Sequence, residues 1–196
     1  MRITKLISVA AACVATSIVL STTALAQTTI LVVDQNRVLR ESSVGKHIDR
    51  QLTSIAKQMD SEIKSQAKPL TGERERLMNE LKNMSVDALK SRPDLQKRAQ
   101  TLQGKMQKTQ VEGQYKQKEL EVTRQKAMNK VHEKLTTILK NLVKERNADI
   151  VLDRSVVIFS GDSVDITATV ISRLNSQMRT VSVVRERIPR KQRNAK

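Results

Sequence analysis

Aromatic residues are almost absent from this sequence: among 196 residues there are one tyrosine, one phenylalanine and no tryptophan. Aromatic side chains supply much of the buried area of a conventional globular core, so such a core is not expected here. Glycine and proline are also scarce, with five and three residues, which excludes collagen-like and many-turned chains. The single cysteine, Cys13, excludes an intramolecular disulfide. What remains is a highly charged composition that is typical of long helices.

The first 26 residues have the pattern of a signal peptide. Basic residues precede an apolar run over residues 6–20, and the small residues of Ala-Leu-Ala follow at 24–26. This pattern predicts export, with cleavage between Ala26 and Gln27. One alternative is an uncleaved membrane anchor, for which the apolar run is short. The other is lipidation at Cys13, which the residues before this cysteine fit poorly.

Positive charge is concentrated in the middle and at the end of the chain. The formal net charge is +16. Residues 45–147 contain 23 basic and 13 acidic residues, and residues 179–196 contain seven and one, whereas residues 148–178 contain two and four. A basic surface attracts acidic partners. Nucleic acid is not an expected partner, because the chain lacks aromatic residues for base stacking and carries an export signal.

Residues 45–147 are predicted to form an antiparallel pair of long helices with a tip near residues 84–93. Apolar residues recur at spacings of three and four, which is the pattern of a helical seam. The seam of the first helix begins with Ile48, Leu52, Ile55, Met59 and Ile63. In the second helix the seam positions between Thr109 and Thr123 are mostly polar or small, so weak packing is expected there. Pro69 predicts a kink in the first helix.

Short aliphatic segments on both sides of the hairpin predict a small head formed by residues 27–44 and 148–178. Residues 28–33 are expected to form a strand, followed by a helix that Asp34 caps. Residues 149–153 and 155–159 predict two more strands, and Asp165 is expected to cap a last helix. A head this small rarely folds alone, so we expect oligomerisation. The basic residues 179–196 are predicted to be a disordered tail.

The order of these segments resembles a known family. The most specific parts are ILVVDQNRVL at residues 30–39, ADIVLD at 148–153 and DITATVISRLN at 165–175. Together with the signal peptide and the helical hairpin, they resemble the Skp/OmpH family of periplasmic outer-membrane-protein chaperones. The resemblance implies an α+β homotrimer with a small β-barrel-like head and one long α-helical arm per subunit. It also implies ATP-independent holding of unfolded outer-membrane proteins in a cavity between the arms.

No catalytic, cofactor-binding or metal-binding residue is predicted. His47 and His132 have no partner at a metal-ligand spacing. The chain without residues 1–26 has no cysteine nucleophile, and no glycine-rich phosphate-binding motif is present. Asp149 and Asp153 could point to the same side of a strand, but no third catalytic group accompanies them. The chain is therefore not expected to be an enzyme.

Contacts with partners are expected on the arm instead, through flexible apolar and basic side chains. The candidate client-binding residues are Met59, Ile63, Met84, Met106, Lys105, Lys108, Lys116 and Lys118. The expected partners are unfolded outer-membrane β-barrel proteins, anionic lipid surfaces and further copies of the chain, all in the periplasm. The alternative function is a structural coiled-coil adapter or tether in the cell envelope, with one fixed partner.

Overall fold

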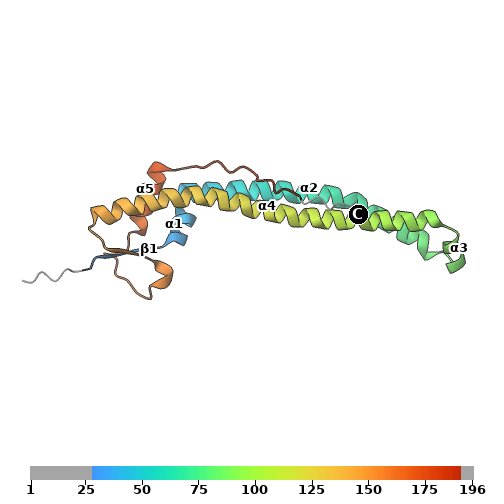
Figure 1. The fold of residues 1–196 in the computed structure, drawn as a ribbon, viewed down its shortest axis with the longest axis horizontal. Helices are drawn as coiled ribbons and strands as arrows, with labels where there is room; N and C mark the ends of the chain where they lie inside the picture. Colours follow the sequence, from blue (N-terminus) through green and yellow to red (C-terminus); the bar gives the residue numbers. More distant parts are fainter. Residues whose placement is uncertain (1–27, 191–196) are drawn as a thin grey trace, which may run out of the picture.

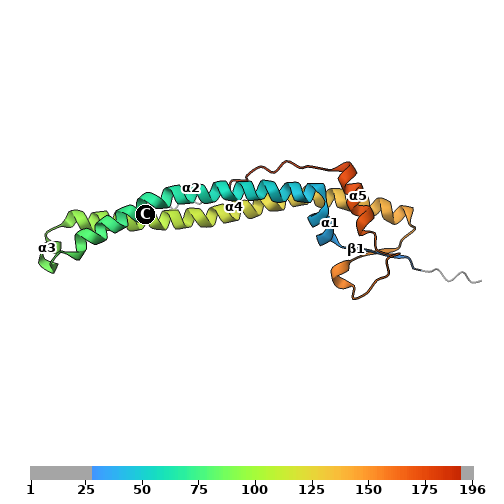
Figure 2. The ribbon, with the colours of Figure 1, turned by 180° about the vertical axis from the view of Figure 1, so that it is seen from behind.

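The computed structural model describes residues 28–190 and shows a long helical arm with a small head at one end (Figures 1 and 2). The predicted signal peptide and its cleavage site lie outside these residues. The elements follow in the order β1 (Ile30–Val33), α1 (Gln35–Glu41), α2 (Ser43–Lys82), α3 (Val86–Lys90), α4 (Pro93–Glu145), β2 (Ile150–Asp153), the 3₁₀ turn η1 (Arg154–Val156) and α5 (Thr167–Gln177). This combination of long helices and a small sheet confirms the α+β class.

The arm consists of α2 and α4, with α3 at the tip (Figure 1). Helix α2 has 40 residues and therefore extends over about 60 Å. It continues through Pro69, so the proline does not end the helix. Pro69 is exposed, where water can replace the lost backbone hydrogen bond. None of the helices within residues 28–190 combines the length and the apolar character needed to cross a membrane.

The seam between α2 and α4 is apolar at both ends and polar in the middle. Near the head, Ile48 and Leu52 pack with Val131, Leu135 and other aliphatic residues in one core. A small cluster near the tip contains Leu77, Leu95 and Leu102. Between the two clusters, the buried side chains of α4 are Lys116, Glu119 and Thr123. The predicted interruption of the apolar seam of α4 over residues 109–123 is thereby confirmed.

The head is organised around β1. Strand β1 pairs in parallel with β2, with Ile30 opposite Ile150 and Val33 opposite Asp153. On the other edge of β1, the Val32 N–H donates to the Val164 carbonyl at 2.8 Å, and the Ile166 N–H donates to the Val32 carbonyl at 2.9 Å. Three extended segments from distant parts of the chain therefore lie side by side. Their apolar face packs on α5, where Val170 and Leu174 are fully buried.

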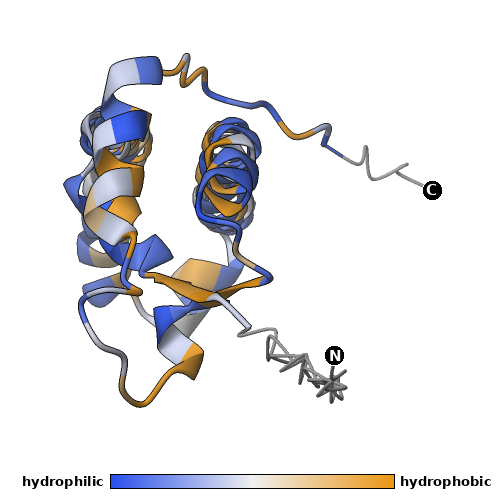
Figure 3. Cartoon of the chain, turned by 90° about the vertical axis from the view of Figure 1, so that its left-hand side faces the viewer, coloured by the Kyte–Doolittle hydropathy of each residue, from blue (hydrophilic) through white to orange (hydrophobic). Residues whose placement is uncertain are grey.

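The prediction of a strand over residues 155–159 is wrong. The Asp153 carboxylate accepts hydrogen bonds from the Ser155 N–H at 2.8 Å and the Ser155 hydroxyl at 2.6 Å, which turns the chain out of the sheet. Alternating apolar residues are typical of a strand, and this pattern alone does not reveal the turn at Asp153. The loop leaves Ile158 and Phe159 103% and 84% exposed. Figure 3 shows a hydrophobic loop, coloured orange, at the edge of the head and away from the arm helices.

Residues 179–190 also differ from the predicted disordered tail. This segment, called the strap below, leaves α5 and runs back along the arm (Figures 1 and 2). It forms no helix or strand, but Val181 and Val183 pack against the main core. His47 Nε2 lies 3.1 Å from the Val181 carbonyl oxygen. The basic composition predicted a solvated tail because it does not reveal that Val181, Val183 and Arg185 have a surface to pack on.

Gly45 permits a sharp junction between α1 and α2. Ser42 ends α1 and caps α2, where its hydroxyl accepts a hydrogen bond from the Gly45 N–H at 3.1 Å. A Cβ at position 45 would collide with the Leu39 carbonyl oxygen. We therefore expect Gly45→Ala to lower the free energy of unfolding by about 1–3 kcal/mol, as measured by urea titration.

A matched control for this substitution is Gly104→Ala. A Cβ at Gly104 meets nothing within 4 Å, so alanine should stabilise α4 by about 0.5–1 kcal/mol through its better helix propensity. Opposite signs for the two substitutions would support the close approach at Gly45. Equal unfolding curves for Gly45→Ala and the unchanged protein would contradict it.

Candidate functional site

The predicted client-binding residues do not form one site. Met59 is 4% exposed and Ile63 is half-buried, and both line a pocket between α2 and α4 together with Lys116 and Leu120. The two other predicted apolar residues lie elsewhere. Met84 packs against the tip cluster, and Met106 is 38% exposed.

The predicted lysines are brought together more closely. Lys105, Lys108 and Lys116 line one open groove along the arm, whereas Lys118 is exposed outside it. The groove has a volume of about 460 Å³. Its walls also contain Leu70 and Thr109, the carboxylates of Glu62 and Glu112, and the strap residues Arg187 and Arg190. Lys116 differs from the other two lysines, because it is buried and forms an ion pair with Glu62.

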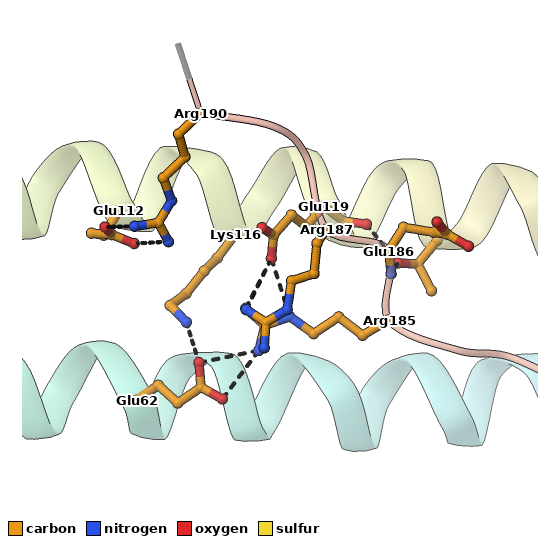
Figure 4. A network of polar contacts seen from close by, with 9 residues as sticks. Glu62, Glu112, Lys116, Glu119, Arg185, Glu186, Arg187 and Arg190 are labelled. Carbon is orange, nitrogen blue, oxygen red and sulfur yellow. Dashed lines mark hydrogen bonds and ion pairs between the residues drawn. The ribbon is translucent and has the colours of Figure 1, made fainter. Parts of the chain in front are cut away.

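Arg185 of the strap connects the two helices beside this groove (Figure 4). Its Nε and Nη2 donate to Glu119 Oε2 on α4 at 3.1 and 2.9 Å. Its Nη1 donates to both carboxylate oxygens of Glu62 on α2, each at 3.1 Å. Lys116 donates to Glu62 as well. One guanidinium therefore bridges α2 and α4 in the polar part of their seam.

Burial distinguishes this bridge from an ordinary surface ion pair. The side chains of Arg185 and Glu119 are only 14% and 3% exposed. Exposed ion pairs contribute little, because water and salt screen them. A buried carboxylate without a cation is costly, so Glu119 depends on its partner. The bridge is thus a specific contact that orders the strap.

The strap backbone is held in register next to this bridge. The Glu186 N–H donates to Thr123 Oγ1 at 2.9 Å, and that hydroxyl donates to the Glu119 carbonyl at 2.6 Å. Glu186 also pairs with Lys126 at 2.7 Å. Further along, Arg190 Nη2 donates to Glu112 Oε2 at 2.7 Å. Both the backbone and the charged side chains of the strap therefore contact α4.

Sequence reasoning missed Arg185, Glu62 and Glu119. One available signal is the alternation of Arg185 and Arg187, which places both on one side of an extended chain. The other is the spacing of seven between Glu112 and Glu119, which places both on one face of α4. Neither signal shows that the strap returns to this face, because the partners Arg185 and Glu119 are 66 residues apart.

The bridge should be sensitive to acid. Hydrogen bonds from Lys116 and then Arg185 hold the pKa of Glu62 below its ordinary value. Such a carboxylate stabilises the folded state fully above its unfolded pKa of about 4.3, and this contribution is lost as the pH falls through the lower folded-state pKa. We expect dyes placed on the strap and on α2 to move apart as the pH falls below the unfolded pKa of about 4.3.

Glu62→Gln is the control for this titration. Glutamine cannot ionise, so the part of the pH response that comes from Glu62 should disappear, and the dyes should already be further apart at pH 7. A dye separation that stays equal from pH 7 to pH 3 in the unchanged protein would contradict the role of this carboxylate.

Within residues 28–190, no three histidine, cysteine, aspartate or glutamate side chains are grouped so that they could hold a metal ion.

The sequence matches the model of a known protein family. The family model described as outer membrane protein (OmpH-like) matches residues 29–174. The chain belongs to the OmpH-like family. The resemblance seen in the sequence is thus confirmed.

A solved structure supports the OmpH-like assignment. It is a crystal structure of a protein from Caulobacter crescentus CB15 that is described as an outer membrane chaperone (OmpH-like). The two chains are 30% identical with a TM-score of 0.69, and the match covers 83% of this chain and 93% of the other. No curated protein gives a significant match. The OmpH-like family match ends at residue 174, so the strap follows the matched region.

Proposed function

We propose that this OmpH-like protein is an ATP-independent periplasmic holdase that keeps unfolded outer-membrane β-barrel proteins from aggregating. The family match and the chaperone description of the Caulobacter protein support this assignment. The observation that carries it is the arm, which is long, strongly basic and lined by an open groove. No residue is proposed to be catalytic, and no cofactor is needed.

The groove suggests how an unfolded chain is captured. Lys105 and Lys108 are exposed at its edge, and their field reaches about 10 Å at 0.1 M salt. They would attract acidic segments first. Leu70 and the neighbouring Ile63 then offer apolar contact. Because each contact is weak, a tighter binding site at the destination can remove the client by mass action.

We also propose that the protein works as a homotrimer joined through its heads. The loop after η1 exposes Val156, Ile158 and Phe159, and Ile30 and Ile150 at the start of the two strands are 39% and 44% exposed. Exposed apolar patches of this kind mark interaction surfaces. The number of subunits rests on the resemblance to the Skp/OmpH family. In such a trimer the arms would enclose a cavity with basic walls.

The test is a light-scattering assay without nucleotide. Several unfolded β-barrel proteins are diluted from urea with and without the mature protein. Suppressed aggregation of all of them would support a holdase. Binding of one partner alone would instead support the structural adapter, and unchanged aggregation of every client would contradict the proposal.

A further inference from the structure

We propose that the arm carries a binding site for extended chains that contain arginine, and that the strap occupies this site in cis. The site lies between α2 and α4 and consists of Glu62, Glu119 and the hydroxyl of Thr123. The proposal goes beyond the holdase function, because it concerns a site filled by the chain itself and holds whether or not a client is captured.

The carboxylates select arginine over lysine by geometry. Glu119 accepts two hydrogen bonds from one edge of the Arg185 guanidinium, and Glu62 accepts from Nη1. A guanidinium has five N–H donors in a fixed plane and can serve two carboxylates from opposite helices together. An ammonium group is a compact point charge and cannot reproduce this planar arrangement.

The rest of the site recognises an extended backbone. Val181, Val183 and Arg185 are spaced by two, so an extended chain directs all three to the same side. The two valines pack on the main core and the arginine enters between the carboxylates. His47 contacts one strap carbonyl, and Thr123 accepts one strap N–H. The ligand is therefore an extended segment in which apolar residues occupy two alternate positions and arginine occupies the next alternate position, as in Val181, Val183 and Arg185.

The site needs an occupant. The ion pairs of Glu119 found within residues 28–190 are with Arg185 and Arg187, both on the strap. Without the strap, this carboxylate loses those cations in the part of the seam where the buried side chains of α4 are polar. The occupant should therefore also clamp the middle of the arm, because it bonds to both helices.

The first experiment uses the full mature chain with Arg185→Ala, which opens the site, and Arg179→Ala as the matched control. Arg179 is exposed, and within residues 28–190 its side chain forms one hydrogen bond, to the nearby Asn175 carbonyl at 3.4 Å. A fluorescent peptide with the sequence of residues 179–190 is then titrated. We expect it to bind the Arg185→Ala protein at least about tenfold more tightly than the Arg179→Ala protein, whose own strap competes.

The peptide provides the test of specificity. An Arg185→Lys peptide should bind the opened protein about tenfold more weakly, whereas an Arg179→Lys peptide should bind as well as the original. Equal binding of the two lysine peptides would overturn the proposed selection of arginine. Equal binding of the original peptide to both protein variants would overturn the site itself.

Hydrogen exchange of the proteins without peptide tests the clamp separately. Residues 113–123 should exchange about tenfold faster in Arg185→Ala than in Arg179→Ala, and the added peptide should restore the slower rate. Equal exchange in the two variants would overturn the clamp. Neither readout depends on client capture, so failure of the holdase assay would leave this proposal standing.

Discussion

Replacing Ile158 and Phe159 together by aspartate is expected to turn the proposed homotrimer into folded monomers. Both side chains are almost fully exposed in the single chain, so the substitutions should not disturb the head core. In an assembly, each would contribute about 1.5–3 kcal/mol of apolar burial, and a buried unpaired aspartate would oppose association further. The affinity between subunits should fall by more than about a hundredfold. Sedimentation velocity measures the change, and circular dichroism checks the fold.

A second pair of substitutions tests whether the expected effect comes from this proposed interface or from the loss of exposed apolar residues in general. Met78 and Val111 are 62% and 47% exposed on the arm, far from the head along the hairpin. Aspartate at both positions introduces the same charge and also removes exposed apolar side chains, but the proposed oligomer should remain. If the Ile158 and Phe159 variant sediments like the unchanged protein, the proposed interface at the head is wrong.

Reversing the charge of Lys105, Lys108 and Lys118 to glutamate should slow the capture of acidic unfolded clients by about ten- to a hundredfold at low salt. All three lysines are exposed. Lys116 is left unchanged, because it is buried against Glu62, and a carboxylate there would destabilise the arm. Stopped-flow mixing with labelled clients measures the rate. Basic clients should lose less, and the difference should shrink as salt rises, because salt screens exposed charges.

The control reverses three exposed lysines elsewhere on the arm, Lys57, Lys82 and Lys130. Both triple variants change the net charge equally, so only the position of the charges differs. A larger effect of the first set would place capture on the part of the arm at and beside the groove. Unchanged rates for acidic and basic clients at every salt concentration would show that capture is not electrostatic, and that apolar contact alone holds the client.

The parts of the fold that depend on neighbouring residues were predictable. Asp34 accepts a hydrogen bond from the Arg37 N–H at 2.7 Å, as its position before the first short helix predicted. The seam of the arm follows from a helical repeat, and the polar gap around Lys116 and Thr123 was visible as an interruption of that repeat. Such features are encoded within a few turns of sequence.

Features that need distant partners were not predictable in this way. The turn at Asp153 and the exposure of Phe159 depend on where the sheet ends, and apolar alternation alone suggested another strand. Arg185 appeared to be one charge in a solvated tail, although it bonds to Glu62 at a separation of 123 residues. Three of the four predicted lysines line one groove, but the prediction did not include the carboxylates and arginines that line it with them.

The parallel pairing of β1 with β2 sets the order in which the molecule can fold. Thr29 and Asp149, joined by a hydrogen bond beside the strands, are 120 residues apart, so β1 is synthesised long before its partner. The arm helices form from local contacts and can close early, whereas the head must wait for the end of the chain. A chain shortened before β2 would therefore keep its arm helices but lose the head surface proposed to join the subunits. If copies associate as proposed, only a chain translated through α5 can join an assembly, so assembly would select chains of full length.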